Sequence, residues 1–187
     1  MKRILKHPNS PIILNSWTIV SRRKDIREQL LIEQDNFCAY TEEWVNPSFA
    51  IDIEHFNDSL KDTNQDGYNN WFAASSKLNR EKNHRKYRNY SEVLHPTENL
   101  NTRLRYDEQL GIYDYDKSDI AVDGLVKILD LNNPILSEDR RNHISYLKTE
   151  LEKRCNNSVG EFIAWLNSHP INKRYRTAIE SVFGVNL

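Results

Sequence analysis

Three short stretches decide how this chain is read: Ile-Asp-Ile-Glu-His-Phe at residues 51–56, Tyr-Asn-Asn-Trp at 68–71 and Leu-Asn-Arg-Glu-Lys at 78–82. They contain an acidic residue next to a histidine, followed by two asparagines. A neutral imidazole can accept a proton near physiological pH, and carboxylate and amide oxygens are ligands for hard divalent cations. These residue types therefore suit hydrolysis at a charged, unreactive bond, provided that the fold brings them together.

The residues around the three stretches predict the order strand, strand, helix. Residues 37–56 are rich in aromatic and β-branched side chains on both sides of Asn46 and Pro47, which favours two short strands joined by a turn. From Tyr68 through Tyr87 the spacing is helical. The expected buried face of this helix consists of Trp71, Ala74, Ser75 and Leu78.

In these residues the chain resembles the HNH nucleases, in the version of the motif that reads His, Asn, Asn. The resemblance implies an α+β fold with a ββα-metal core, preceded by an N-terminal arm and helix and followed by a mainly helical C-terminal part. It implies that His55 is the general base and that Asn70 orients it. It also implies that Glu54 and Asn79 bind one catalytic Mg²⁺ or Mn²⁺ ion, so that the chain hydrolyses phosphodiester bonds of nucleic acid.

A geometric condition follows for Glu54 and His55. Neighbouring residues of a regular strand point to opposite faces, so the strand must end or bend here if both side chains are to reach one phosphate. The alternative reading of the motif is structural: His55 is an ordinary half-buried strand histidine, and Asn70 caps the following helix.

A structural zinc ion is not expected. Many HNH relatives bind zinc through two Cys-x-x-Cys pairs, but the corresponding positions here are Cys38 and Thr41, then Ser75 and Leu78. One thiolate out of four does not make a zinc site. We expect these residues and neighbouring aromatic side chains to pack directly against one another.

A basic run follows the motif in a chain whose formal net charge is only -1. Basic side chains bind phosphates without reading sequence, so the run is a candidate nucleic-acid contact. Its alternative is a solvated helix end. The candidate residues are Lys77, Arg80, Lys82, His84 and Arg85.

Outside the motif the pattern predicts one globule with two parts. The first, residues 1–95, holds an extended arm, a helix from Ser21 towards Asn36 and the nuclease core. The second, residues 96–187, holds a hairpin over 102–116 and several helices, and is expected to dock a partner. The expected helices lie around 122–129, from Pro134 to about Cys155, around 162–166 and over 175–183.

Composition and the lack of targeting signals indicate a cytoplasmic protein. Two cysteines allow at most one disulfide, and neither a signal peptide nor a membrane-spanning segment is expected. The layout also resembles the small HNH proteins encoded beside an ABC-type or SMC-like ATPase in bacterial antiphage defence systems of the Septu kind. That resemblance implies an ATPase partner and double-stranded DNA or transfer RNA as the target. The alternative is a non-catalytic adaptor or nucleic-acid-binding module built on a degenerate HNH fold.

Overall fold

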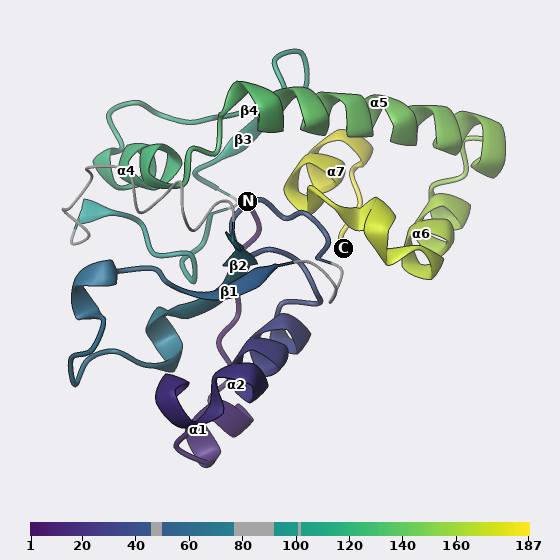
Figure 1. Ribbon diagram of the computed structural model, residues 1–187. Helices are drawn as coiled ribbons and strands as arrows, with labels where there is room; N and C mark the ends of the chain where they lie inside the picture. The colour runs from purple at the N-terminus through teal and green to yellow at the C-terminus, as the bar shows by residue number, and fades with distance from the viewer. Residues whose placement is uncertain (46–49, 77–91, 101) are drawn as a thin grey trace.

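The computed structural model describes residues 1–45, 50–76, 92–100 and 102–187 of the 187-residue chain. It is an α+β protein in which two antiparallel strand pairs are surrounded by helices (Figure 1). The α-helices are α1 (Pro11–Leu14), α2 (Ile19–Glu33), α4 (Ile120–Leu129), α5 (Pro134–Cys155), α6 (Val159–Ser168) and α7 (Arg176–Phe183). The strands are β1 (Ile51–His55), β2 (Trp71–Ser75), β3 (Arg105–Asp107) and β4 (Ile112–Asp114). The 3-10 helices are η1 (Asp58–Leu60), η2 (Tyr68–Asn70) and η4 (Pro170–Lys173).

Strands β1 and β2 form the antiparallel pair at the centre of the molecule, with Ile51 opposite Ser75 and His55 opposite Trp71. The helix expected from Tyr68 through Tyr87 is therefore wrong over residues 71–75, which form β2, and its part from residue 77 onward lies outside the described residues. The first four residues of β2 are all buried, so the strand lacks the alternation that normally marks a strand. A short apolar run of this kind fits a helical face equally well, and pairing with β1 decides the outcome.

The stretch between α2 and β1 also differs from the prediction of a first strand. Residues 37–45 form a compact turn closed by an isolated bridge between Phe37 and Trp44. The buried side chain of Gln34 connects this turn to β2: its amide nitrogen donates to the carbonyl oxygens of Phe37 and Ala73, and its oxygen accepts from the Ala73 N–H, all at 2.9 Å. The expected turn at Asn46 and Pro47 lies outside the described residues.

The N-terminal arm packs on the core and is not extended throughout. Pro11 begins the short helix α1, capped by the Ser10 hydroxyl, and the side chains of Ile4 and Ile12 are buried. Helix α2 confirms the predicted helix but begins earlier, because Thr18 caps it by accepting from the Ser21 N–H. Both helices lie on the same side of the β1–β2 pair in Figure 1, and α2 packs against both strands.

The C-terminal half agrees with the prediction in element type and order. The hairpin is β3–β4, and Gly111 just before β4 has φ +71°, a conformation that favours glycine. Its missing Cβ also leaves room for the Ser137 carbonyl of α5. Helices α4, α5 and α6 begin at side-chain caps supplied by Asp119, Asn133 and Ser158.

Buried apolar residues from both halves of the chain belong to one continuous core. The long helix α5 packs against α6 and α7, and α7 packs against β3. Within the described ranges, none of the helices combines the length and the apolar composition needed to cross a lipid bilayer.

Candidate functional site

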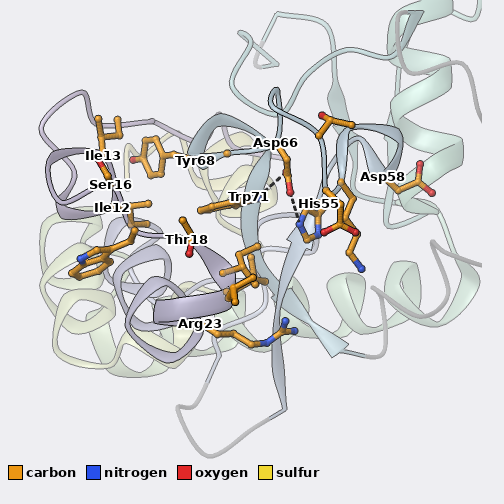
Figure 2. Close-up of a pocket in the computed structure, with 18 residues that line it drawn as sticks. Ile12, Ile13, Ser16, Thr18, Arg23, His55, Asp58, Asp66, Tyr68 and Trp71 are labelled. Atoms are coloured by element: carbon orange, nitrogen blue, oxygen red, sulfur yellow. Dashed lines mark hydrogen bonds and ion pairs between the residues drawn. The ribbon is translucent and has the colours of Figure 1, made fainter.

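A cavity of about 580 Å³ lies beside the end of β1, between the N-terminal helices and the loop that joins β1 to β2 (Figure 2). Residues 12–23 line one wall, and residues 58–68 of the loop line the opposite wall. The strand pair contributes Ile53, His55 and Trp71. The predicted general base therefore borders a cavity large enough for a small ligand.

His55 is held by a carboxylate that the motif did not include. Its Nε2 lies 3.1 Å from Oδ2 of Asp66, and both side chains are mostly buried, with exposed fractions of 14% and 11% (Figure 2). A neutral histidine that donates from Nε2 to a carboxylate carries its basic lone pair on Nδ1. The contact with Asp66 thus favours the tautomer in which Nδ1 is the basic nitrogen.

Asn70 acts on His55 through Asp66. Its Nδ2 donates to Oδ1 of Asp66 at 3.0 Å, and the indole Nε1 of Trp71 donates to the same oxygen at 2.8 Å. Asn70 also bonds both backbone groups of Asn57, accepting from its N–H at 2.8 Å and donating to its carbonyl at 3.0 Å. Asn70 therefore closes the loop and fixes one oxygen of Asp66, which leaves the other oxygen facing the histidine.

Glu54 lies on the opposite face of β1. Strand β1 ends at His55, as the geometric condition required, but the side chain at position 54 still points away from the cavity. Glu54 is buried, with 1% of its surface exposed, and accepts a hydrogen bond from the Tyr40 hydroxyl. Glu54, the described member of the predicted metal-ligand pair, therefore does not line the cavity that His55 borders. Within the described parts of the chain, His, Cys, Asp and Glu side chains form no group of three or more that could hold a metal.

Asn79, the other predicted ligand, lies outside the described residues. The predicted nucleic-acid contacts at Lys77, Arg80, Lys82, His84 and Arg85 lie outside them as well. Cations that do line the cavity come from other segments, namely Arg23 of α2 and Lys61 of the loop.

Three of the four positions that correspond to zinc ligands are described. The thiol of Cys38 is free and buried. The hydroxyl of Thr41 donates to the Glu43 carboxylate at 2.9 Å, and Ser75 ends β2. Leu78 lies outside the described residues.

Comparison with known proteins found no match among protein-family models, curated proteins or solved structures.

Lys6 of the N-terminal arm contacts residues that flank the site. Its ammonium group donates to the Trp71 carbonyl and lies over the rings of Tyr68 and Phe72, 4.4 and 4.1 Å from their centroids. Burial lowers the pKa of Lys6 to about 7, against the opposing charge of Glu33. Trp71 thus joins the arm to the site, because its backbone pairs with His55 and its indole holds Asp66.

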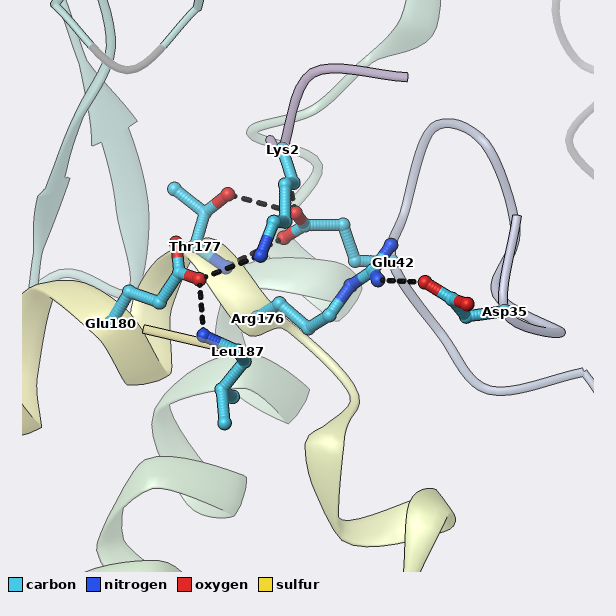
Figure 3. Close-up of polar contacts among 7 residues, drawn as sticks. All are labelled: Lys2, Asp35, Glu42, Arg176, Thr177, Glu180 and Leu187. Carbon is cyan, nitrogen blue, oxygen red and sulfur yellow. Dashed lines mark hydrogen bonds and ion pairs between the residues drawn. The ribbon is translucent and has the colours of Figure 1, made fainter. Parts of the chain in front are cut away.

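A second network centres on the buried carboxylate of Glu42, which does not line the cavity (Figure 3). Its two oxygens accept from the Lys2 N–H, the Thr177 hydroxyl and N–H, and the Tyr113 hydroxyl. Burial alone would raise the pKa of Glu42, but the N-terminal ammonium group, the Thr177 hydrogen bond and Arg176 together lower it. This carboxylate connects the arm and the 37–45 turn to β4 and α7.

Asp66 is the functional candidate that reasoning from the motif missed. It lies in a polar loop, Asn-Asp-Ser-Leu-Lys-Asp-Thr-Asn-Gln-Asp-Gly at 57–67, outside the three stretches that carry the motif. The usable signal was chemical: a histidine base in a protein is normally held by a carboxylate or carbonyl on its other nitrogen. Asp66 is an acid four residues before Asn70, in the loop that must return to the histidine strand.

Proposed function

We propose that the chain is a metal-dependent HNH endonuclease that hydrolyses phosphodiester bonds of nucleic acid. One observation carries the proposal: the His55–Asp66 pair lies at the wall of a cavity, at the end of the antiparallel pair β1–β2, with Asn70 bound to the same carboxylate. A ββα-metal core requires such a strand pair, with the histidine at the end of its first strand.

In this proposal His55 removes a proton from the attacking water through Nδ1. Asp66 keeps the imidazole in the reactive tautomer and stabilises the imidazolium that forms. Asn70 and Trp71 are positioning residues, since both donate to Oδ1 of Asp66 and so hold the carboxylate in place. Arg23 and Lys61 supply positive charge to the phosphodiester at the cavity.

The divalent ion is part of the proposal because the sequence resembles the HNH nucleases. Because Glu54 does not face His55, no step is assigned to the ion, and the cleavage experiment tests the metal requirement directly. An ATPase partner and a role in antiphage defence rest on the same resemblance.

The specific observation on Glu54 also favours a second candidate, a non-catalytic adaptor on a degenerate HNH fold. A carboxylate buried against Tyr40 stabilises a fold without binding a catalytic ion. The two candidates differ in thermal stability with metal: an ion that binds only the native site raises the midpoint of unfolding, whereas an adaptor is indifferent to Mn²⁺.

The deciding experiment incubates purified protein with plasmid DNA and with total tRNA, in Mg²⁺, in Mn²⁺ and in EDTA. His55→Ala and His169→Ala are compared with the wild type. His169 serves as the control because it is an exposed histidine that does not line the cavity. The nuclease requires cleavage that depends on metal and on His55 but not on His169. Cleavage that His55→Ala retains in full would remove His55 as the base.

A further inference from the structure

We infer that the cavity beside His55 binds the base of one unpaired nucleotide, so that the preferred substrate is single-stranded or locally unpaired nucleic acid. The inference rests on the proposed nuclease function and names its substrate class. It is carried by the two unlike walls of the cavity and by its charges.

The wall formed by residues 12–23 is mostly apolar, with Ser16, Thr18 and Arg23 as its polar members, and it is partly solvent-exposed. Ile13 and Val20 both line the cavity, and they are 44% and 99% exposed. Trp17, between them in the sequence, lines the cavity as well. Trp17 packs partly against the core, so its ring is held in place. A fixed aromatic ring beside exposed aliphatic side chains is a surface on which a flat, amphipathic group gains stacking and apolar burial.

The polar wall determines which part of a nucleotide enters. Three carboxylates, Asp58, Asp62 and Asp66, line the cavity from the loop. The cations Arg23 and Lys61 that also line it have exposed side chains. The exposed cations attract the phosphate that His55 must reach, whereas the amino groups of an uncharged base suit the carboxylates of Asp58 and Asp62.

The volume also limits the occupant. A cavity of about 580 Å³ falls within the range of sites for single small ligands, which run from roughly 300 to 1,000 Å³. A stacked base pair of a duplex cannot enter such a site, because each base is held between its neighbours. A base that is already unpaired can enter without the free-energy cost of unstacking.

The test measures binding separately from cleavage. Short labelled oligonucleotides of DNA and of RNA, each as a single strand and as the matched duplex, are titrated into His55→Ala protein by fluorescence anisotropy. We expect the single strand to bind about tenfold more tightly than its duplex, in DNA, in RNA or in both.

Two pairs of variants locate the binding to the arm. Trp17→Ala should weaken single-strand binding about tenfold, whereas Trp165→Ala, which alters another partly buried tryptophan packed on the core, should not. Val20→Glu adds a negative charge at the cavity and should also weaken single-strand binding. Val20 is fully exposed near the start of α2, so the change should leave the packing of the core intact. Its control is Val159→Glu at the start of α6.

Equal affinity for single strand and duplex, or wild-type affinity in both Trp17→Ala and Val20→Glu, would overturn the inference, as would no binding at all. Failure of the nuclease proposal looks different: wild-type protein leaves all substrates intact while the single-strand preference and the variant effects persist.

Discussion

The carboxylates of Asp66 and Glu42 are alike in chemistry but differ in what surrounds them. Each accepts several hydrogen bonds and each connects distant parts of the chain. Glu42 is 2% exposed, and it accepts hydrogen bonds from backbone N–H groups and hydroxyls. Asp66 directs one oxygen to a histidine at the wall of a cavity. The contrast teaches that burial and hydrogen-bond number indicate structural importance, whereas a proton-accepting partner beside open space indicates chemistry.

The largest effect should come from Asp66→Asn. The two donors on Oδ1 hold the amide oxygen of the new side chain, so its NH₂ group faces His55 and forces the other tautomer. We expect cleavage to fall about 10²- to 10⁴-fold, with the free energy of unfolding changed by about 1 kcal/mol or less. Single-turnover cleavage and urea denaturation measure the two quantities.

The matched control is Asp116→Asn, which alters an aspartate that accepts two hydrogen bonds from Ser118, far from the cavity lining. Cleavage in this variant should equal that of the wild type. If Asp66→Asn also cleaves at the wild-type rate, Asp66 does not orient the base.

The next effect should come from Glu42→Ala and should appear in stability. The change leaves the Thr177, Tyr113 and Lys2 donors buried without their acceptor, which costs about 3 to 5 kcal/mol. Glu42→Gln keeps the shape and should cost about 1 to 3 kcal/mol. Both are read from the urea midpoint. A Glu42→Ala protein with unchanged stability and reduced cleavage would contradict the structural role assigned to Glu42.

A smaller effect, on the pH dependence of stability, should come from His143, a buried histidine that has no role in the proposed chemistry of His55. His143 is buried, with Nε2 3.0 Å from the Asn172 carbonyl, and burial together with the charge of Arg174 lowers its pKa to about 4. The unfolded chain binds this proton near pH 6.5, so stability is lost as the pH falls from about 6.5 to about 4. The full loss is about 3 kcal/mol. His143→Gln should remove that part of the acid sensitivity in urea titrations at pH 7 and pH 4.5, and an unchanged difference between the two pH values would contradict this.

The smallest effect should come from Tyr68→Phe, at the edge of the cavity. The hydroxyl donates to Glu33 at 2.6 Å and accepts from the His7 N–H at 2.8 Å, so its removal should cost about 1 kcal/mol. The ring remains, and cleavage should fall by less than one order of magnitude. Tyr115→Phe, which removes a hydroxyl bonded to Asp123, should have a similar effect on thermal unfolding and none on cleavage. A large loss of cleavage in Tyr68→Phe would assign chemistry to its hydroxyl.

The parts of the fold that the sequence predicted are those with local causes. Helix α5 begins at Pro134 and ends at Cys155 as expected, because a proline at the first turn and an asparagine at the end define it. The β3–β4 hairpin follows from the turn at Gly111. Strand β2 was assigned wrongly, because its partner lies across a loop and both of its faces are buried.

Prediction of the site was limited in the same way. His55 and Asn70 follow from a linear pattern, and the structure brings them onto one carboxylate. Asp66 depends on how the loop returns, which no local spacing determines. The face of Glu54 follows from strand alternation: its side chain contacts Tyr40 and does not line the cavity that His55 borders.

The side chain of Gln34 has a consequence for self-association. The Ala73 N–H and carbonyl point away from β1, and a two-stranded sheet with such an open edge could recruit a strand from another copy of the chain. The amide of Gln34 bonds both groups, and the Ala39 N–H also donates to the Ala73 carbonyl at 3.1 Å, so the place that another strand would take is filled. Gln34 and the 37–45 turn thereby cover the open edge of this small sheet at Ala73.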